Sequence, residues 1–501
     1  MLSCGSSIIV VYIVFFLYKT GESMLDATTL PYLVRAVCYK IFKDNENSTM
    51  CMNLDKNHEL EDIIQKQSGN YLIYHRLLQN IPAIAVSLFC GSYSDRYGRK
   101  IPTVLPNLGT IFAVVLYFAS NLVPEYRIGI FLSGSALQGL FGNRSVITMA
   151  VYGLVFDLSK EKNRTRNLGR LLAMNFFGLT LGALFSGVFQ DVLDINSAFA
   201  SILVLHGTAI LLTIVLVPGT KEKKDSMAKN NKEGAEEASY ALCDLFRPSN
   251  VKETIAVMFK SRSENKRIIL IILFIMSVVN QTCRAGEVDV KFLFVTRSPL
   301  SWPKSWYGYL LSSDYATMGF GLLLIMPLLC NKLELSDVTI MMLAIGSQIA
   351  RLIFMGVSDE LWTIVVSVVV GVLTGVVSSA LRSMIGKAVH VEEAGKIFSL
   401  VSCGETLSKF LGPLVFVNIY NATADIFPGI SFLVEVSIFV IMLVVLGAMF
   451  KQLRALHNLL TNITVHVVSK SDQRQSITND KQDIPPQSNF PSQEDKKELY
   501  I

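Results

Sequence analysis

The chain has 501 residues, of which 51% are hydrophobic and only 17% are charged, and its mean hydropathy is +0.44. A water-soluble protein of this length needs far more polar surface to cover its core. The composition therefore predicts an integral membrane protein. The formal net charge of +5 follows from lysines and arginines on one side of the predicted membrane segments, and it gives no indication of nucleic-acid binding.

Apolar runs of roughly 20 residues recur along the chain, the length at which a helix crosses a hydrocarbon core of about 30 Å. Because a segment in lipid must satisfy its own backbone hydrogen bonds, these runs are predicted to be helices. The short alternating strands of a barrel are not seen. The predicted fold class is an all-α polytopic membrane protein. We predict twelve spans, at 4–30, 70–91, 101–120, 128–156, 168–189, 198–217, 268–296, 306–330, 338–357, 362–386, 397–420 and 429–450.

The first span has three interpretations. Its apolar run, "SSIIVVYIVFFLY", has the length of a signal-peptide core, but it lacks a basic segment before it and a small-residue cleavage site. A second interpretation continues the helix through Lys19, Glu22 and Asp26, which then share one face and point toward a cavity or toward one another. In the third, the helix ends at Tyr18 and these charges are solvated.

Lysine and arginine gather in alternate breaks between the spans, at 96–100, 160–166 and 218–267. This bias predicts that those breaks and both termini are cytosolic, and that the 31–68 loop is external. The sequence leaves the plasma membrane and an endolysosomal membrane equally open as the location.

A polar segment at 218–267, nearly free of aromatic residues, divides the predicted spans into two groups of six. It has the composition of a flexible cytosolic linker. We therefore expect an N-terminal six-helix bundle at 1–217 and a C-terminal one at 268–450, the arrangement typical of transporters built from two halves. Residues 451–501 show no globular pattern and are predicted to be a disordered cytosolic tail.

The run "GSYSDRYGRK" between the second and third spans resembles the signature loop of the major facilitator superfamily. In that family the signature's aspartate, here Asp95, pairs with a helix of the other bundle, and its arginine, here Arg99, joins a charge relay. Arg96 adds a further charge to this gating motif. Gly91 allows close helix approach, and Gly98 suits the tight turn. The alternative is an ordinary positively charged hairpin turn.

Further blocks resemble solute carrier family 46: "DLSKEKNRTRNLGRLLA", "SPLSWPKSWYGY", "ALRSMIGKAVHVEEAGKIFSLVSCGE" and "NIYNATADIFPGISFL". The resemblance extends in patches from about 70 to 445. It implies the two-bundle major facilitator fold and import of a small organic anion such as a folate, a muropeptide or a conjugated steroid, often with protons. An uncoupled facilitator of the same solutes and a non-transporting receptor or scaffold are the alternatives.

Two residues match functional positions of the folate-transporting member of that family. Asp157 follows the fourth span, and its alternative role is to cap the next segment. Arg382 lies in "SSALRSMIG", where small neighbours let another helix pack closely, and its alternative is to reach the membrane interface without a partner.

The seventh span, containing "NQTCRAGEVDV", is the richest in charge. Arg284 and Glu287 are three residues apart, so they can pair. Arg284 replaces a histidine used by the folate-transporting relative, which puts histidine-based proton coupling in doubt. If protons are coupled, the candidate carboxylates are Glu287, Asp289, Asp314 and Glu405. Arg284 and Arg382 favour an anionic substrate. The alternative for this group is ion pairing between helices without any ligand.

No enzyme activity, metal site or cofactor is predicted. The six histidines have no metal-ligand spacing, and the absence of a Walker-type loop excludes ATP as the energy source. The predicted partners are a small-molecule substrate, protons and the lipid bilayer, whereas the oligomeric state is not predicted. Cys38 and Cys51 fall in the first external loop, where either a disulfide or two free thiols are possible. Asn47, in "NST", is the candidate glycosylation site in that loop.

Overall fold

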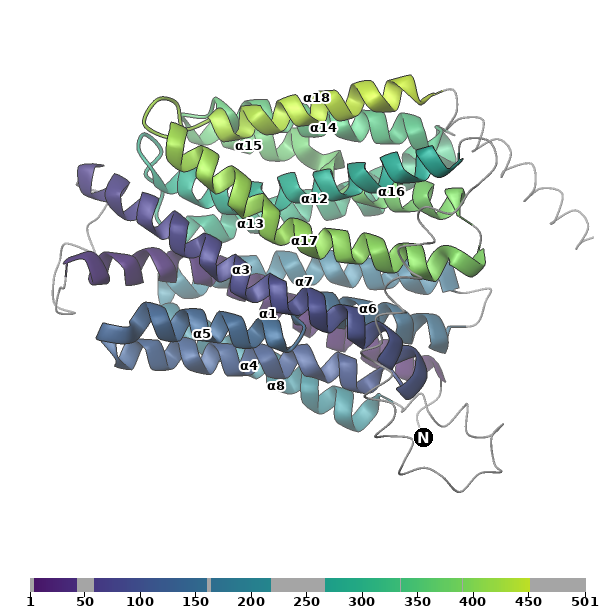
Figure 1. The fold of residues 1–501 in the computed structure, drawn as a ribbon, viewed down its shortest axis with the longest axis horizontal. Helices are drawn as coiled ribbons and strands as arrows, with labels where there is room; N and C mark the ends of the chain where they lie inside the picture. Colours follow the sequence, from purple (N-terminus) through teal and green to yellow (C-terminus); the bar gives the residue numbers. More distant parts are fainter. Residues whose placement is uncertain are drawn as a thin grey trace, which may run out of the picture. The chain divides into compact units, whose positions relative to one another are not determined.

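The computed structural model describes residues 4–42, 58–159, 164–217, 266–333, 335–389 and 391–450, which are helical apart from short turns (Figure 1). The N-terminal half contains α1 Cys4–Phe42, α3 His58–Tyr97, α4 Lys100–Leu122, η2 Pro124–Tyr126, α5 Arg127–Leu140, α6 Asn143–Leu158, α7 Arg164–Val192 and α8 Ile195–Leu216. The C-terminal half contains α12 Lys266–Thr296, α13 Trp306–Phe320, η4 Gly321–Ile325, η5 Leu328–Lys332, α14 Asp337–Gly356, α15 Leu361–Val370, η6 Gly371–Leu373, α16 Thr374–Ala388, α17 Val391–Thr423 and α18 Ile430–Ala448.

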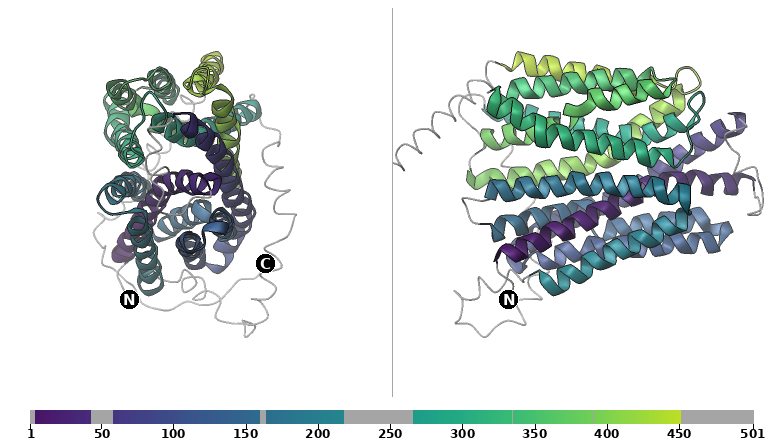
Figure 2. Two further views of the ribbon diagram at one scale, coloured as in Figure 1. Left: turned by 90° about the vertical axis from the view of Figure 1, so that its left-hand side faces the viewer. Right: turned by 180° about the vertical axis from the view of Figure 1, so that it is seen from behind.

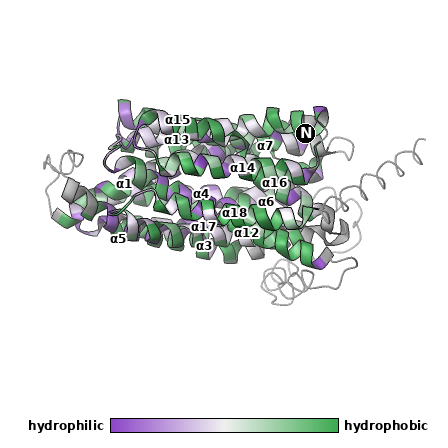
Figure 3. Cartoon of the chain, turned by 90° about the horizontal axis from the view of Figure 1, so that it is seen from above, coloured by the Kyte–Doolittle hydropathy of each residue, from purple (hydrophilic) through white to green (hydrophobic). Residues whose placement is uncertain are grey.

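Within these ranges, ten helical segments are long and apolar enough to cross a membrane. The other two predicted crossings are α3, which is long but more polar, and the successive helices α5 and α6, which are individually short. The fold is therefore the predicted all-α polytopic arrangement. Apolar side chains also lie on the outside of the helices, as expected for a lipid-facing surface; Figure 3 shows hydrophobic residues along their whole length.

The first two helices are longer than predicted. α1 continues to Phe42 and α3 begins at His58, so the predicted 31–68 loop is wrong at both ends. The apolar content around Pro31 and Tyr32 explains the first extension, because both side chains are buried by neighbouring helices. Residues 43–57 lie outside the described part of the chain, as do residues 218–265 of the predicted 218–267 linker and the predicted tail at 451–501; the last two linker residues belong to α12.

The predicted fourth span, 128–156, is interrupted in its middle. Gly142 adopts a φ of 84°, and Asn143 follows at a φ of 43°, so the chain leaves α5 in a tight turn before α6 begins. Glycine takes positive φ without steric penalty, which makes this position suited to the break. The interruption matters for the site, since it points the first turn of α6 toward the space between the two halves.

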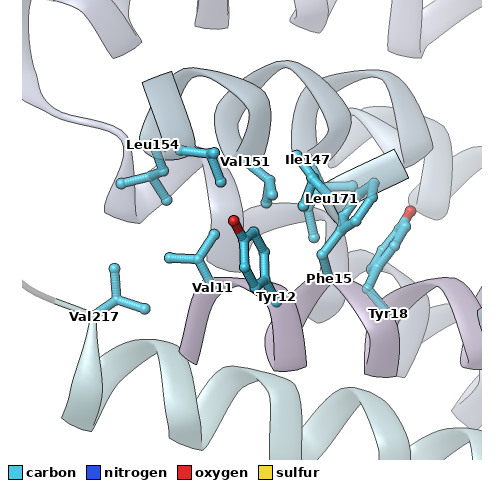
Figure 4. Close-up of a cluster of buried hydrophobic side chains, with 10 residues drawn as sticks. Val11, Tyr12, Phe15, Tyr18, Ile147, Val151, Leu154, Leu171 and Val217 are labelled. Carbon is cyan, nitrogen blue, oxygen red and sulfur yellow. The ribbon is translucent and has the colours of Figure 1, made fainter. Parts of the chain in front are cut away.

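α1 crosses the N-terminal half and packs against α7 and α8 (Figure 2). Figure 4 shows the apolar cluster that fixes its first turns, where Phe15 and Tyr18 of α1 pack toward Ile147 and Val151 of α6 and Leu171 of α7. The two halves meet chiefly where α7 packs on α13 and where α3 packs on α17. Side chains from α1, α3 and α6 thereby face those of α12 and α17.

A candidate charged cavity between the two halves

A cavity of about 170 Å³ lies between the two halves of the chain. α1, α3 and α6 supply its lining from the N-terminal half, and α12, α13 and α17 supply it from the C-terminal half. The lining residues are Asp26, Arg76, Asn80, Arg144, Gln281, Arg284, Ala285, Val288, Tyr315, Glu405 and Lys409. Four of these are cations and two are acids, so the cavity carries an excess of positive charge.

Asp26 on α1 holds two of the cations in place. Its Oδ1 accepts a hydrogen bond from Nη1 of Arg76 at 3.2 Å, and its Oδ2 accepts one from Nη2 of Arg144 at 2.9 Å. Nε of Arg144 is also 3.1 Å from Oε1 of Glu22, which in turn binds Lys19 at 2.8 Å. These contacts confirm the interpretation in which the α1 helix continues past Tyr18 with its charges on one face, and the interpretation that ends it there is wrong.

Arg284 and Lys409 differ from the other cavity cations. Nη2 of Arg284 lies 3.1 Å from the sulfur of Met318, a weak acceptor, and neither Arg284 nor Lys409 forms an ion pair in the described part of the chain. Both nevertheless line the cavity. Both side chains are half-buried, so they leave two positive charges at the cavity that no described carboxylate neutralises.

Arg382 on α16 binds Glu405 on α17 through two hydrogen bonds. Its Nε lies 3.1 Å from Oε1 and its Nη2 lies 2.5 Å from Oε2. The paired arrangement is the fork geometry that makes arginine–carboxylate contacts strong. Glu405 lines the cavity and Arg382, whose side chain is exposed, does not, so Arg382 is joined to the cavity only through Glu405.

The carboxylates of the seventh and eighth spans form a separate buried cluster inside the C-terminal half. Glu287 binds Arg351 of α14 and lies 2.9 Å from Nζ of Lys291, and Lys291 also binds Asp314 of α13. The predicted pair of Glu287 with Arg284 is therefore wrong. One helical turn separates Arg284 from Glu287, but α12 presents the arginine to the cavity and the carboxylate to α14.

Asp289 points in a third direction, across to the other half of the chain. Its two oxygens accept hydrogen bonds from Arg76 of α3, at 3.1 Å for Nε and 2.7 Å for Nη2. Asp289 is completely buried. Of the carboxylates proposed from the sequence, the structure thus brings Glu405 to the cavity and Asp289 to the joint between the halves, and leaves Glu287 and Asp314 in the C-terminal half.

The signature motif lies mostly on the last turns of α3 and is a loop only at Gly98 and Arg99. Gly98 has a φ of 104°, as the predicted tight turn requires, whereas Gly91, Asp95 and Arg96 belong to the helix. Nε of Arg99 donates to Oδ2 of Asp157 at 2.6 Å, and its Nη1 donates to Ser94 at 3.2 Å. Asp157 therefore pairs with the signature arginine.

The remaining predicted residues concern the first external loop. Cys38, near the end of α1, is disulfide-bonded. Asn47 and Cys51 lie outside the described residues, so the disulfide pairing and the glycosylation site stay predictions.

Five charged residues of these networks were not singled out from the sequence: Arg76, Arg144, Lys291, Arg351 and Lys409. Each lies within or beside an apolar run, which is itself the signal for a buried functional charge. What the sequence lacks is the pairing, because each partner comes from a helix distant in the chain.

Helices crossing in two six-segment halves around a charged cavity define this molecule as a multi-span membrane transporter fold. The sequence model of the Major Facilitator Superfamily matches residues 77–455. The chain belongs to that superfamily.

Several similar proteins are members of solute carrier family 46, as the sequence blocks suggested. A lysosomal proton-coupled steroid conjugate and bile acid symporter, SLC46A3 of Gallus gallus, is 24% identical over 454 residues, 86% of this chain and 92% of that one. The proton-coupled folate transporter of Rattus norvegicus is 24% identical, covering 78% and 82% of the two chains. A probable peptidoglycan muropeptide transporter of Drosophila melanogaster is 23% identical, covering 78% and 75%.

Solved structures agree on the fold. The human organic anion transporter MFSD10 superposes with a TM-score of 0.60 at 15% identity, covering 89% of this chain and all of that one. A D-xylose–proton symporter superposes with a TM-score of 0.63 at 14% identity, covering 88% and 96%. The chain is thus an integral membrane protein of the transporter type and not an enzyme.

Proposed function

We propose that this protein is a secondary transporter that moves a small organic anion across the membrane by alternating access, with protons as the coupled ion. The observation that carries the proposal is the pair formed by Arg284 and Lys409, two cavity cations from the C-terminal half that have no carboxylate partner among the residues the structure describes. A bound anion would supply the missing charge. Arg284 offers a planar fork suited to a carboxylate or a sulfate, and Lys409 offers a single mobile charge.

The cavity lining also suggests what accompanies the negative charge. Ala285, Val288 and the ring of Tyr315 give it an apolar wall beside the cations. A solute with one or two anionic groups on an apolar or aromatic body fits this division. The names of the similar proteins, which specify steroid conjugates, bile acids, folate and muropeptides, describe solutes of that kind.

Exchange of ion-pair partners would link substrate binding to movement of the halves. Arg76 and Arg144 come from the N-terminal half, whereas Arg284 and Lys409 come from the C-terminal half. An anion held between them would neutralise both walls and stabilise a closed intermediate. When Arg144 turns toward the substrate, Asp26 loses one of its two cations, so substrate binding is linked to the ion pairs of the N-terminal wall.

For the topology, we propose that the signature motif faces the cytosol, together with both termini. The opposite end, where α1 ends and α3 begins, then faces outside or the lumen, and Asn47 carries a glycan there. The disulfide of Cys38 is consistent with an oxidising compartment on that side. A gel-mobility shift on glycosidase treatment that is lost in Asn47→Gln tests this orientation. The lysosomal membrane and the plasma membrane are both compatible with it.

Uptake measurements test the proposed function directly. Cells that expose the protein at their surface are given a radiolabelled folate, a steroid sulfate or a muropeptide at about pH 5.5 and about pH 7.5. We expect uptake of at least one of them above that of Arg284→Gln, and faster at the lower pH. Uptake of equal rate at both pH values would favour an uncoupled facilitator. No uptake of any anion, with the protein verified at the surface, would contradict transport and favour a receptor or scaffold role.

A further inference from the structure

A carboxyl group without a partner lies in the core of the C-terminal half. Glu435 is the one charged residue of α18, "ISFLVEVSIFVIMLVVLGA", and its side chain is completely buried. Neither of its carboxyl oxygens has a hydrogen-bond partner among the described residues. An acid in the middle of a membrane helix needs a reason to be there, and a structural role would be expected to show a bond.

The groups around Glu435 belong to the cluster that holds Glu287. α18 packs on α12, α14 and α17. The charged groups that act on Glu435 are Glu287 and Lys291 of α12 and Arg351 of α14, and the thiol of Cys283 on α12 is a further titratable neighbour.

From α17, the charged side chains Glu405 and Lys409 line the cavity instead. The other titratable groups described on α17 are the buried phenol of Tyr420 and the thiol of Cys403. The charged groups around Glu435 are therefore those of the Glu287 cluster.

The charges of this cluster are balanced without Glu435. Glu287 and Asp314 contribute two negative charges, and Lys291 and Arg351 contribute two positive charges, so their sum is zero. An ionised Glu435 would leave one uncompensated negative charge in a site that excludes water. Because a buried, unbonded carboxylate is so costly that it takes up a proton instead, Glu435 is neutral in this arrangement.

We propose that Glu435 is the proton-carrying residue of this transporter, and that it releases its proton when Arg351 turns from Glu287 toward it. The inference rests on the proposed function and names the group that binds the coupled ion. It also shifts the proton site from the carboxylates indicated by the sequence, all of which are ion-paired, to one that is not.

Arg351 has the geometry for such an exchange. One of its nitrogens binds Glu287, whereas Nε and Nη1 have no hydrogen-bond partner among the described residues. Its stem packs against Gly371, where the helix of the tenth span becomes a short 3-10 segment, η6. Such a segment inside a membrane helix is a common hinge, so movement of the tenth span would displace Arg351.

The proton step is balanced. In one arrangement Arg351 neutralises Glu287, and Glu435 carries the proton. In the other, Arg351 neutralises Glu435, whose O–H bond breaks and whose electron pair stays on the carboxylate, while the proton passes to water or to Glu287. The number of charges on Arg351 and the two carboxyl groups is unchanged when Glu287 accepts the proton. One proton thus moves from Glu435 to Glu287 when Glu287 accepts it, and one proton leaves the cluster when water accepts it.

Infrared spectroscopy of the purified full-length protein in lipid nanodiscs tests the protonation state without any substrate. We expect the wild type to show the stretching band of a protonated carboxyl group at about pH 7.5, and Glu435→Gln to lack it. Glu435→Gln keeps the size and the neutrality of the protonated acid, so it should fold. Asp359→Asn, which removes an exposed carboxylate, is the matched control and should leave the band unchanged. An unchanged band in Glu435→Gln would overturn the proposal.

The carrier role is tested by pH. If Glu435 carries the proton, the carboxyl band should disappear reversibly as the pH of the nanodisc sample is raised. A band that stays at every pH would show a permanently protonated residue and would also overturn the proposal. In cells, the ratio of steroid sulfate uptake at about pH 5.5 to that at about pH 7.5 should fall to about one in Glu435→Gln and be restored in Glu435→Asp. A ratio equal to the wild type's in Glu435→Gln would contradict the carrier role.

The two proposals fail in different ways. If the wild type takes up none of the anions, the proposed function is contradicted while the infrared titration still decides the state of Glu435. If uptake is pH-dependent and Glu435→Gln leaves the infrared carboxyl band unchanged, the transport proposal stands and the assignment of the proton to Glu435 is rejected.

Discussion

Arg76 of α3 and Asp289 of α12 form a doubly hydrogen-bonded ion pair that joins the two halves of the protein. Both side chains are buried, and Arg76 also binds Asp26 at the wall of the cavity. Arg76 thus belongs both to the contact between the two halves and to the candidate substrate site. A substrate anion that draws Arg76 or neutralises its surroundings would weaken the closure, which is the coupling that alternating access requires.

We predict that breaking this pair from one side costs more than removing both charges. Asp289→Asn leaves Arg76 without its main partner, and such a loss costs about 3–5 kcal/mol for a buried pair. The double variant Arg76→Gln with Asp289→Asn should therefore recover part of the thermal stability that each single variant loses. The measurement is the apparent melting temperature of the purified protein in detergent. Strictly additive losses would show that the two residues do not interact energetically.

In a second ion-pair contact, Asp425, which follows α17, binds Lys66 of α3 at 2.6 Å and Arg297, which follows α12, at 3.0 Å. Hydrogen bonds from Lys66 and Arg297 lower the pKa of Asp425. A carboxylate with a lowered pKa keeps its stabilising contribution above its ordinary pKa and loses it only as the pH falls through the lowered value. The contact should therefore persist at about pH 5.5.

This predicts that acidification alone does not open the contact, whereas Asp425→Asn opens it at any pH. A cysteine placed at Asn421, which packs against Gly69 of α3, should react faster with an impermeant maleimide in Asp425→Asn than in the wild type. Glu360→Gln, an exposed acid that pairs with neither residue, is the control. Faster labelling of the wild type at about pH 5.5, after correction for thiol reactivity, would contradict the prediction.

The pair of Arg99 and Asp157 predicts an effect on turnover. It lies at the signature-motif end and contributes no residue to the cavity. Asp157→Asn, Arg99→Gln and Asp95→Ala should lower the maximal transport rate with little change in substrate affinity. Arg170→Gln, on the exposed surface of α7, should leave both unchanged. A large loss of affinity with normal turnover would place these residues in binding instead of gating.

Gly371 predicts a stability effect that concerns the Arg351 cluster. A Cβ at this position would lie 2.1 Å from Cδ of Arg351, a side chain that is only 1% exposed, so the arginine stem would have to shift within a packed site. Gly371→Ala should cost about 1–3 kcal/mol and lower the apparent melting temperature. Gly346→Ala is the matched control on α14, where the new methyl group meets nothing within 4 Å. An equal melting temperature in the two variants would show that the tenth span accommodates the methyl group freely.

The fold could be predicted from the sequence because a lipid bilayer requires long, apolar helices. Runs of apolar residues such as 198–217 and 429–450 correspond closely to α8 and α18, since a membrane helix needs length and hydropathy alone. Errors occur where polar residues belong to a span. The predicted loop at 31–68 failed because α1 and α3 extend past the apolar runs and bury their polar residues against other helices.

The site was only partly accessible, for a different reason. Sequence spacing detects partners three or four residues apart, which made Lys19 with Glu22 predictable and suggested Arg284 with Glu287 wrongly. Glu287 binds Arg351, 64 residues away, and Arg76 binds Asp289, 213 residues away. Such pairs depend on helix packing, which hydropathy does not encode. Glu435 was not singled out from the sequence for the same reason, because the charged groups near it come from α12 and α14.

The measurement that tests the central claim most directly is the affinity of the purified protein for a steroid sulfate and for the corresponding uncharged steroid. It is made on the wild type, Arg284→Gln, Lys409→Gln and the control Lys332→Gln, whose lysine is exposed outside the cavity. We predict that Arg284→Gln and Lys409→Gln each weaken binding of the sulfate by about 1.5–3 kcal/mol, roughly 10-fold to 150-fold, and barely change binding of the uncharged steroid. Equal losses for both ligands, or unchanged affinity for the sulfate, would contradict the assignment of these two cations as the anion site.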